Sequence, residues 1–277
     1  IRDYFDPLHF GFIAINGKLD DIDFKDNKLT SNIFLSAKEK NGFEVSELSS
    51  HLTFTSEVME FRKLKLKTPF SEAGDFYSMK YDDFTDDMNE FIDSVTLDCH
   101  FKNSRISTED ISYFAPALKS WHTTFDVNAD VKGRISRLEF PNLDISGSNT
   151  AIKGSLSLKE LPSIDKLYIN LRSEKTNTNY RDLCFLVPEI KSITQPRLDR
   201  LGNISFKGDF SGYIRDFVAK GDIGSALGNF YSDVKITLPE KGSPTYSGKI
   251  RSNNFKLGAF TDSKQVGNIA LDGELKG

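Results

Sequence analysis

Apolar and polar residues alternate along most of this chain. Phe125, Val127 and Val131 stand at alternate positions with polar neighbours, and residues 204–210 and 269–275 repeat the alternation. A period of two places apolar side chains on one face of a β-strand and polar side chains on the other. Turn-forming stretches such as "SGS", "KGSP" and "KDNK" separate the alternating runs. The pattern therefore predicts an all-β chain of short strands, each with one face in water.

Two phrases recur along the chain. "GNISFKGDFSG" at 202–212 returns as "GNIALDGELKG" at 267–277, and "FAPALKS" at 114–120 returns as "LVPEIKS" at 186–192. A glycine within a strand costs stability, so its recurrence indicates a bulge, a bend or a close backbone approach. Ordinary turn glycines are the alternative. We expect a long, mainly antiparallel sheet that curves repeatedly, because such a sheet needs these residues at its bends.

A few short helices are also predicted. In "STEDISYFAPALKS" (107–120), Ser107 and Asp110 have the spacing of a capping box, and Pro116 interrupts the apolar face that follows. The related segment at 181–192 again combines a short apolar run with a proline. The acidic stretch at 81–95 is interpreted as another short helix or as a loop over the sheet edge.

The length of the chain allows one large all-β unit or two smaller domains. Because the repeats extend throughout, we predict one continuous repetitive β segment, 1–277, with approximate sub-units 1–105, 106–180 and 181–277. The sequence starts without methionine and stops just after a repeated phrase. We therefore expect it to be part of a longer protein.

Composition narrows the classes of partner. Thirty-six basic and forty acidic residues give a net charge of −4, without the basic footprint of a nucleic-acid-binding protein. Cys99 and Cys184 are too few for a disulfide framework, and whether they pair stays open. No run approaches the ~18 consecutive apolar residues of a membrane-spanning helix.

No motif with a defined chemistry stands out. The sequence lacks a G-x-S-x-G elbow, a Walker loop and a dinucleotide fingerprint, and its four histidines have no zinc-like spacing. The acids at 82–87 lack the spacing and central glycine of a calcium loop. Carboxylate pairs for glycoside hydrolysis stay open, because any chain rich in Asp and Glu offers them. We predict no enzymatic activity, no catalytic residue, no metal and no cofactor.

Several segments resemble one known family. Residues 201–238, which begin "LGNISFKGDFSGYIRDF", are similar to the repetitive region of TamB-like proteins in the AsmA-like superfamily, as are residues 133–162 and 64–95. "DISYFAP" at 110–116 resembles a phrase that often precedes a repeat in that family. The resemblance covers nearly the whole chain, and its motifs are degenerate.

The resemblance implies a fold and a cellular role. TamB-like proteins are anchored in the inner membrane by an N-terminal helix, which this sequence does not contain, and span the periplasm as a sheet folded into an open, β-taco-like groove. They meet an Omp85-family outer-membrane barrel (TamA-like) and are implicated in moving phospholipid between the membranes, or in outer-membrane biogenesis. The resemblance thus implies a periplasmic location and phospholipid acyl chains as partners.

The residues suit this role, because a sheet with one apolar face must bury that face against something. In an open groove, acyl chains would cover it and remove the apolar side chains from water. Ordinary core packing is the alternative for each residue, and a scaffold or chaperone that pairs its sheet edges with outer-membrane proteins is the alternative function. The predicted lipid-groove residues are Phe125, Val127, Val131, Ile152, Leu156, Ile204, Phe206, Phe210, Ile269 and Leu271.

Overall fold

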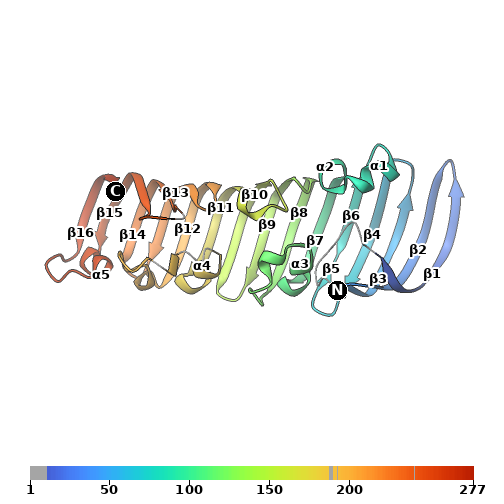
Figure 1. The fold of residues 1–277 in the computed structure, drawn as a ribbon, viewed down its shortest axis with the longest axis horizontal. Coiled ribbons are helices and arrows are strands. Elements are labelled where there is room, and N and C mark those ends of the chain that lie inside the picture. Colours follow the sequence, from blue (N-terminus) through green and yellow to red (C-terminus); the bar gives the residue numbers. More distant parts are fainter. Residues whose placement is uncertain (1–10, 187–189, 192, 240) are drawn as a thin grey trace. The chain divides into compact units, whose positions relative to one another are not determined.

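A computed structural model describes residues 11–186, 190–191, 193–239 and 241–277 (Figure 1). The chain divides into two compact units. Unit 1 extends to Ser148 and includes Glu160–Ile164, whereas unit 2 comprises Asn149–Lys159 and Asp165–Gly277.

Unit 1 is a sheet of antiparallel strands in which almost every strand lies beside its neighbour in sequence. The short β5 and β6 both lie between β4 and β7. Three helices and a 3₁₀ turn connect the strands: α1 (Phe84–Asn89), α2 (Phe91–Ser94), α3 (Thr108–Phe114) and Pro116–Leu118. The strands are β1 (Phe12–Lys25), β2 (Lys28–Glu39), β3 (Glu44–Phe54), β4 (Val58–Lys67), β5 (Glu72–Ala73), β6 (Asp75–Lys80), β7 (Thr96–Ser107), β8 (Thr124–Arg134) and β9 (Arg137–Gly147).

Unit 2 is an antiparallel sheet whose strands follow the order of the sequence. Its connections include α4 (Tyr180–Leu186), the 3₁₀ turn Leu198–Leu201 and α5 (Leu257–Thr261), and a further 3₁₀ turn spans Ile164–Lys166. The strands are β10 (Thr150–Lys159), β11 (Tyr168–Asn179), β12 (Asn203–Tyr213), β13 (Asp216–Ser225), β14 (Gly228–Thr237), β15 (Thr245–Phe255) and β16 (Ile269–Lys276).

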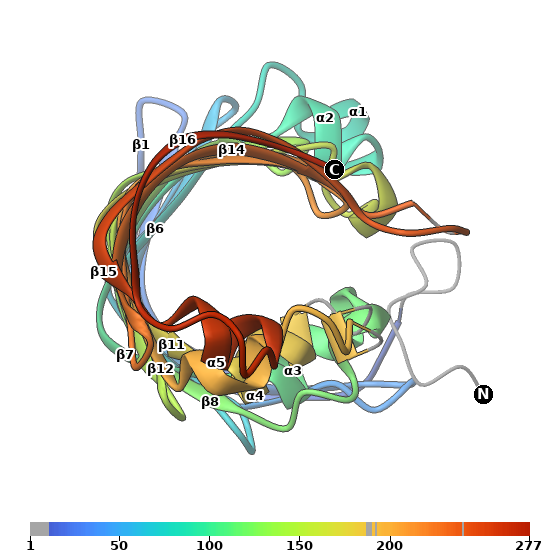
Figure 2. The same ribbon diagram turned by 90° about the vertical axis from the view of Figure 1, so that its left-hand side faces the viewer.

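The predicted fold class is confirmed. The chain is all-β, its strand pairs are antiparallel, and only short helices interrupt them. Figure 2 shows that the strands within each unit bend into an arc that stays open on one side, and that α5 lies on the concave side of unit 2. We call the concave surface of each unit its inner face and the convex surface its outer face.

In unit 1, β-bulges accompany the bend of the strands. Asp21 in β1, Lys63 in β4 and Asn103 in β7 each lie at a register shift and have a positive φ of about 50°. A bulge inserts an extra residue on one strand, which bends that strand and increases its twist. These bends therefore come from non-glycine residues, which the glycine-based prediction did not identify.

Buried serines complete the hydrogen bonding at several bends. Ser31 donates to the Asp20 carbonyl oxygen at 2.8 Å, and Ser50 donates to the Arg62 carbonyl oxygen at 2.9 Å. Both serines lie opposite a bulge, where the regular ladder of backbone hydrogen bonds is interrupted. Because a buried carbonyl needs a partner, the serine hydroxyl replaces the missing ladder bond.

In unit 2, glycines bring neighbouring strands together at the bend. Gly208 of β12 and Gly221 of β13 are direct cross-strand partners, with φ of 152° and 153°. A Cβ atom on Gly208 would collide with the Lys220 carbonyl oxygen and lie 2.6 Å from the Gly221 Cα. The same line of paired residues continues to Ser173 on one side and Ser232 on the other. Gly208 and Gly221 are therefore close-approach positions within strands, one of the three roles predicted for the recurring glycines, whereas a Cβ atom on Gly273, the counterpart of Gly208 in the second phrase, would meet nothing within 4 Å.

The helix predicted after Ser107 begins there, whereas α5 was not predicted. The Ser107 side chain caps α3 by accepting a hydrogen bond from the Glu109 amide at 3.2 Å. Asp110 does not complete a capping box; its carboxylate accepts hydrogen bonds from the hydroxyls of Thr68 and Ser71. α3, α4 and α5 follow β7, β11 and β15, so the repeat consists of four strands and a short helix. Residues 187–189 and 192 of the second proline segment lie outside the described part of the chain.

The acidic stretch at 81–95 contains α1 and α2, and its carboxylates cap α1. Asp83 Oδ1 accepts hydrogen bonds from the amides of Thr85 and Asp86, and Asp87 Oδ2 accepts from the amide of Asp82. Met88 and Phe91 on these helices pack against a small buried cluster at the inner face of unit 1. The cluster consists of Val95, Leu97, Cys99 and Val131.

Candidate functional site

The inner face of unit 2 carries lines of apolar side chains that run from strand to strand. Directly paired residues of an antiparallel sheet share a face, so the register identifies these lines. One line contains Ile152, Thr176, Phe206, Ile223 and Phe230 on five successive strands. A second line contains Leu156, Leu171, Phe210, Ala219, Val234, Gly248 and Leu275 on seven successive strands.

All seven predicted groove residues of unit 2 belong to this inner face. Ile204 lies two positions before Phe206 on β12, Leu271 pairs with Ser252, and Ile269 pairs with Phe255. Aromatic contacts connect the strands: the rings of Phe230 and Phe255 lie 5.5 Å apart, and Phe260 of α5 lies 5.4 Å from Phe255. The structure therefore brings the predicted residues of unit 2 together on one surface.

Unit 1 has a comparable inner face. Phe125, Val127 and Val131 lie on the same side of β8, and Val131 pairs with Cys99. Another line of paired residues crosses the unit: Phe24, Leu29, Phe54, Met59, Met79 and Leu97. The sequence interpretation identified no lining residue before Phe125, because it relied on runs that contain glycine. The alternation in residues 29–37 and 52–61 is the signal that would have identified the earlier strands.

Most side chains of the inner faces are only partly covered. Of the ten predicted residues, Val131 is buried and the other nine are half-buried. On β1, Ile15, Leu19 and Phe24 pair with inner-face residues of β2 and are 63%, 53% and 70% exposed. A packed sandwich core would bury such side chains almost completely. The inner faces are therefore accessible apolar surfaces, each in its own unit.

A buried carboxylate holds α3 against the β2–β3 hairpin of unit 1. Glu39 is 1% exposed and accepts hydrogen bonds from the Tyr113 hydroxyl at 2.7 Å and from the amides of Asn41 and Gly11. The Phe43 ring stacks on Tyr113 at 5.2 Å. Burial works to raise the pKa of Glu39, but these hydrogen bonds outweigh it and hold the pKa below its ordinary value.

We expect the stability of unit 1 to fall below about pH 4.5, the ordinary pKa of Glu39. Because the folded-state pKa is lowered, the unfolded chain binds more protons, so stability is present above that pH and lost as pH falls through the folded pKa. Thermal unfolding of wild type and Glu39→Gln, followed by circular dichroism across this range, checks the prediction. Glu39→Gln should flatten the pH dependence, whereas Glu57→Gln, an exposed residue of the β3–β4 turn, should not. An unchanged slope in Glu39→Gln would contradict the assignment.

The cysteines and histidines occupy separate environments. Cys99 and Cys184 are both buried and free, and burial raises the pKa of the Cys99 thiol to about 12. His100 is on the outer face of unit 1, with Nδ1 2.6 Å from Asp130 Oδ1. A hydrogen bond with Asn142, which has the larger effect, and one with His100 lower the pKa of Asp130 below its ordinary value. Among the described residues, no three His, Cys, Asp or Glu side chains are grouped to hold a metal ion.

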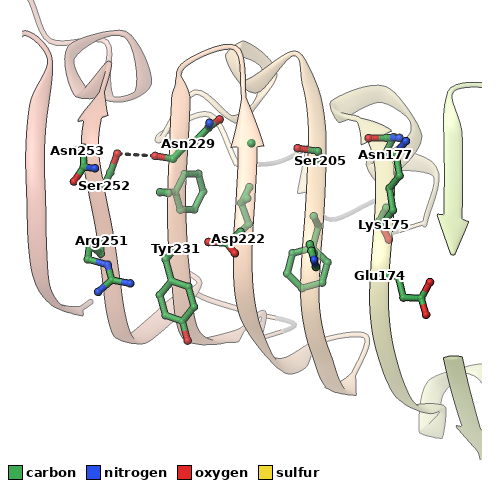
Figure 3. Close-up of a pocket in the computed structure, with 16 residues that line it drawn as sticks. Glu174, Lys175, Asn177, Ser205, Asp222, Asn229, Tyr231, Arg251, Ser252 and Asn253 are labelled. Carbon is green, nitrogen blue, oxygen red and sulfur yellow. Dashed lines mark hydrogen bonds between the residues drawn. The ribbon is translucent and has the colours of Figure 1, made fainter. Parts of the chain in front are cut away.

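A hollow of about 570 Å³ lies on unit 2 between β11 and β15 (Figure 3). Its exposed side chains come from the outer face. Lys207 follows the inner-face residue Phe206 on β12 and therefore points outward. Asp222, Tyr231 and Arg251 share its face, because Lys207 pairs with Asp222, Asp222 with Tyr231 and Tyr231 with Arg251. Figure 3 shows Arg251 beside Tyr231, and the guanidinium lies 5.5 Å from the ring centroid. The sequence analysis did not identify this hollow, because its residues come from five strands.

Comparison with protein-family models, with curated proteins and with solved structures gives no match to this chain. The resemblance to TamB-like proteins stays a prediction. None of the helices in the described part of the chain has the length and apolar character needed to cross a bilayer.

Proposed function

We propose that the inner faces bind phospholipid acyl chains and that the chain is a segment of a periplasmic bridge that conducts phospholipid between two membranes. The observation that carries the proposal is the pair of accessible apolar inner faces, whose lining side chains are mostly half-buried. Apolar surface gains roughly 25 cal/mol per Å² when it leaves water, whichever apolar group covers it. An acyl chain laid along these lines of side chains would provide that cover.

The dimensions of unit 2 suit an acyl chain. Its seven strands, spaced about 4.8 Å apart, give an inner face about 29 Å long. A bilayer core of ~30 Å holds two acyl chains end to end, so one chain extends about 15 Å. The face is therefore longer than one acyl chain, which leaves room for a chain to move along it. The polar headgroup would remain in water at the open side.

Lipid extraction tests this proposal. We expect the purified 277-residue chain to carry phospholipid that mass spectrometry detects after solvent extraction, and to bind a fluorescent phospholipid once delipidated. A photo-crosslinker at Ile223 on the inner face should label that lipid. The alternative scaffold function predicts protein crosslinks along the strand edges instead. Absence of both extracted and bound lipid would contradict the proposal.

A further inference from the structure

The outer face of unit 2 carries a row of charges that neutralise one another. Six directly paired residues on successive strands alternate in sign: Arg172, Asp209, Lys220, Asp233, Lys249 and Glu274. Lys220 Nζ lies 3.2 Å from Asp233 Oδ2, and Arg172 Nε lies 3.4 Å from Asp209 Oδ1. Opposite charges on paired strands stabilise a sheet, so this row is explained by the fold itself.

The neighbouring row, which lines the hollow, follows this rule only in part: Lys207 pairs with Asp222 and Arg251 pairs with Asp272, but one end of the row is basic. Lys175 lies in the β11 bulge that faces Lys207 of β12, so two like charges are adjacent across the strands. Such a placement is destabilising without a compensating anion. Within the described part of the chain, Lys175, Lys207 and Arg251 form no ion pair, and all three are exposed. Two carboxylates, Glu174 and Asp222, leave the hollow with an excess of one positive charge.

Gly224 lines the hollow beside these charges. It pairs with Ser205 on one strand and Asn229 on the other, and a Cβ atom there would lie 2.5 Å from Ser205 Oγ and 3.2 Å from Asn229 Oδ1. The absence of a side chain on Gly224 thus leaves room for the Ser205 hydroxyl and the Asn229 side chain beside it. Figure 3 shows Asn177 on β11 and Asn253 on β15, one strand further out on each side.

These groups match one class of ligand. Lysine and arginine bind carboxylate, phosphate or sulfate through charge-assisted hydrogen bonds. Asparagine and serine side chains both donate to and accept from neutral hydroxyls, and the Tyr231 ring offers a flat apolar surface. An acidic oligosaccharide combines all three features: acidic groups, many hydroxyls and apolar ring faces.

We propose that this hollow on the outer face of unit 2 binds an acidic oligosaccharide. The site is on the face opposite the apolar lining, so it does not depend on lipid binding. Lys207 and Arg251 would contact the acidic groups, while Ser205, Asn229 and Tyr231 would contact the sugar rings and hydroxyls. The acidic group can be a carboxylate or a sulfate.

Isothermal titration calorimetry with the whole 277-residue chain tests the site. The probes are trigalacturonate, its methyl ester, a sulfated chondroitin tetrasaccharide and inorganic phosphate. We expect trigalacturonate or the chondroitin probe to bind. The affinity for the probe that binds should fall about tenfold in Lys207→Gln, because this variant loses one charge-assisted contact. The methyl ester, which keeps the sugar and removes the charge, should bind at least about tenfold more weakly than trigalacturonate.

Lys249→Gln is the matched control, because Lys249 is an exposed lysine of the same outer face outside the hollow. The affinity of Lys249→Gln for the acidic oligosaccharide should stay within about twofold of the wild-type value. Equal losses in Lys207→Gln and Lys249→Gln would indicate general charge attraction and overturn the proposal. Phosphate binding as tight as that of the oligosaccharides, or no binding of either acidic oligosaccharide, would also overturn it.

Discussion

Gly208→Val should destabilise unit 2 by at least about 3 kcal/mol and lower its urea unfolding midpoint markedly. A valine Cβ at this position would overlap the Lys220 carbonyl oxygen and approach Gly221 Cα to 2.6 Å, and both are backbone atoms that cannot rotate away. The φ of 152° adds strain, because β-branched residues rarely adopt it. The two strands would have to separate at the bend. Urea unfolding followed by circular dichroism measures the change.

Gly273→Val is the control for this substitution. Gly273 is also an inner-face strand residue of unit 2, but a Cβ atom there meets nothing within 4 Å. Its substitution should change stability by no more than about 0.5 kcal/mol, because valine suits an unobstructed strand position. If both variants lost the same stability, close approach at Gly208 would not be the reason for its glycine.

Ala219→Glu should reduce the phospholipid that co-purifies with the chain at least about tenfold, which corresponds to roughly 1.4 kcal/mol. Ala219 lies in the middle of the longer apolar line of unit 2, paired with Phe210 and Val234. A carboxylate there stays hydrated while the face is open to water, so the fold should survive. An acyl chain laid over it would have to remove that water, and burying an unpaired charge is unfavourable by far more than one contact gains.

The adjacent residue supplies a matched control. Val218 is half-buried like Ala219, but its side chain is on the outer face, where it pairs with Ser211 and Lys235. Val218→Glu introduces the same charge on the same strand and should leave the lipid content unchanged. Circular dichroism would verify that both variants fold. Equal lipid loss in the two variants would count against the inner face as the binding surface.

The curvature of the sheets and the accessibility of their apolar inner faces are linked in this protein. Bulges accompany the bends in both units, close glycine contacts add to them in unit 2, and both leave the apolar face on the concave side. Short helices contact only parts of that face, as Phe260 of α5 does at Phe255. An accessible apolar surface is retained because the described part of the chain adds strands of the same kind to each sheet and places no second sheet over them.

The ten predicted groove residues lie on the inner faces of their units, but the sequence interpretation was incomplete. It named Ile152 and Phe206, yet omitted Ile223 and Phe230, which continue the same line on the next two strands. Their strands show the same alternation, so this information was present in the sequence. What they touch depends on the register between strands, which alternation within one strand does not specify.

The sequence by itself determined the strand-rich fold class, the apolar side of several strands from β8 onward and the N-cap of α3 at Ser107. These features are local, since they depend on residues a few positions apart. Only the tertiary structure decided the bulges at Asp21 and Lys63, the Glu39–Tyr113 hydrogen bond between residues 74 positions apart, and the convergence of Lys207 and Arg251 on one hollow. The bulges depend on the register between neighbouring strands, which alternation within one strand does not specify. The other two features bring together residues that are far apart in the sequence.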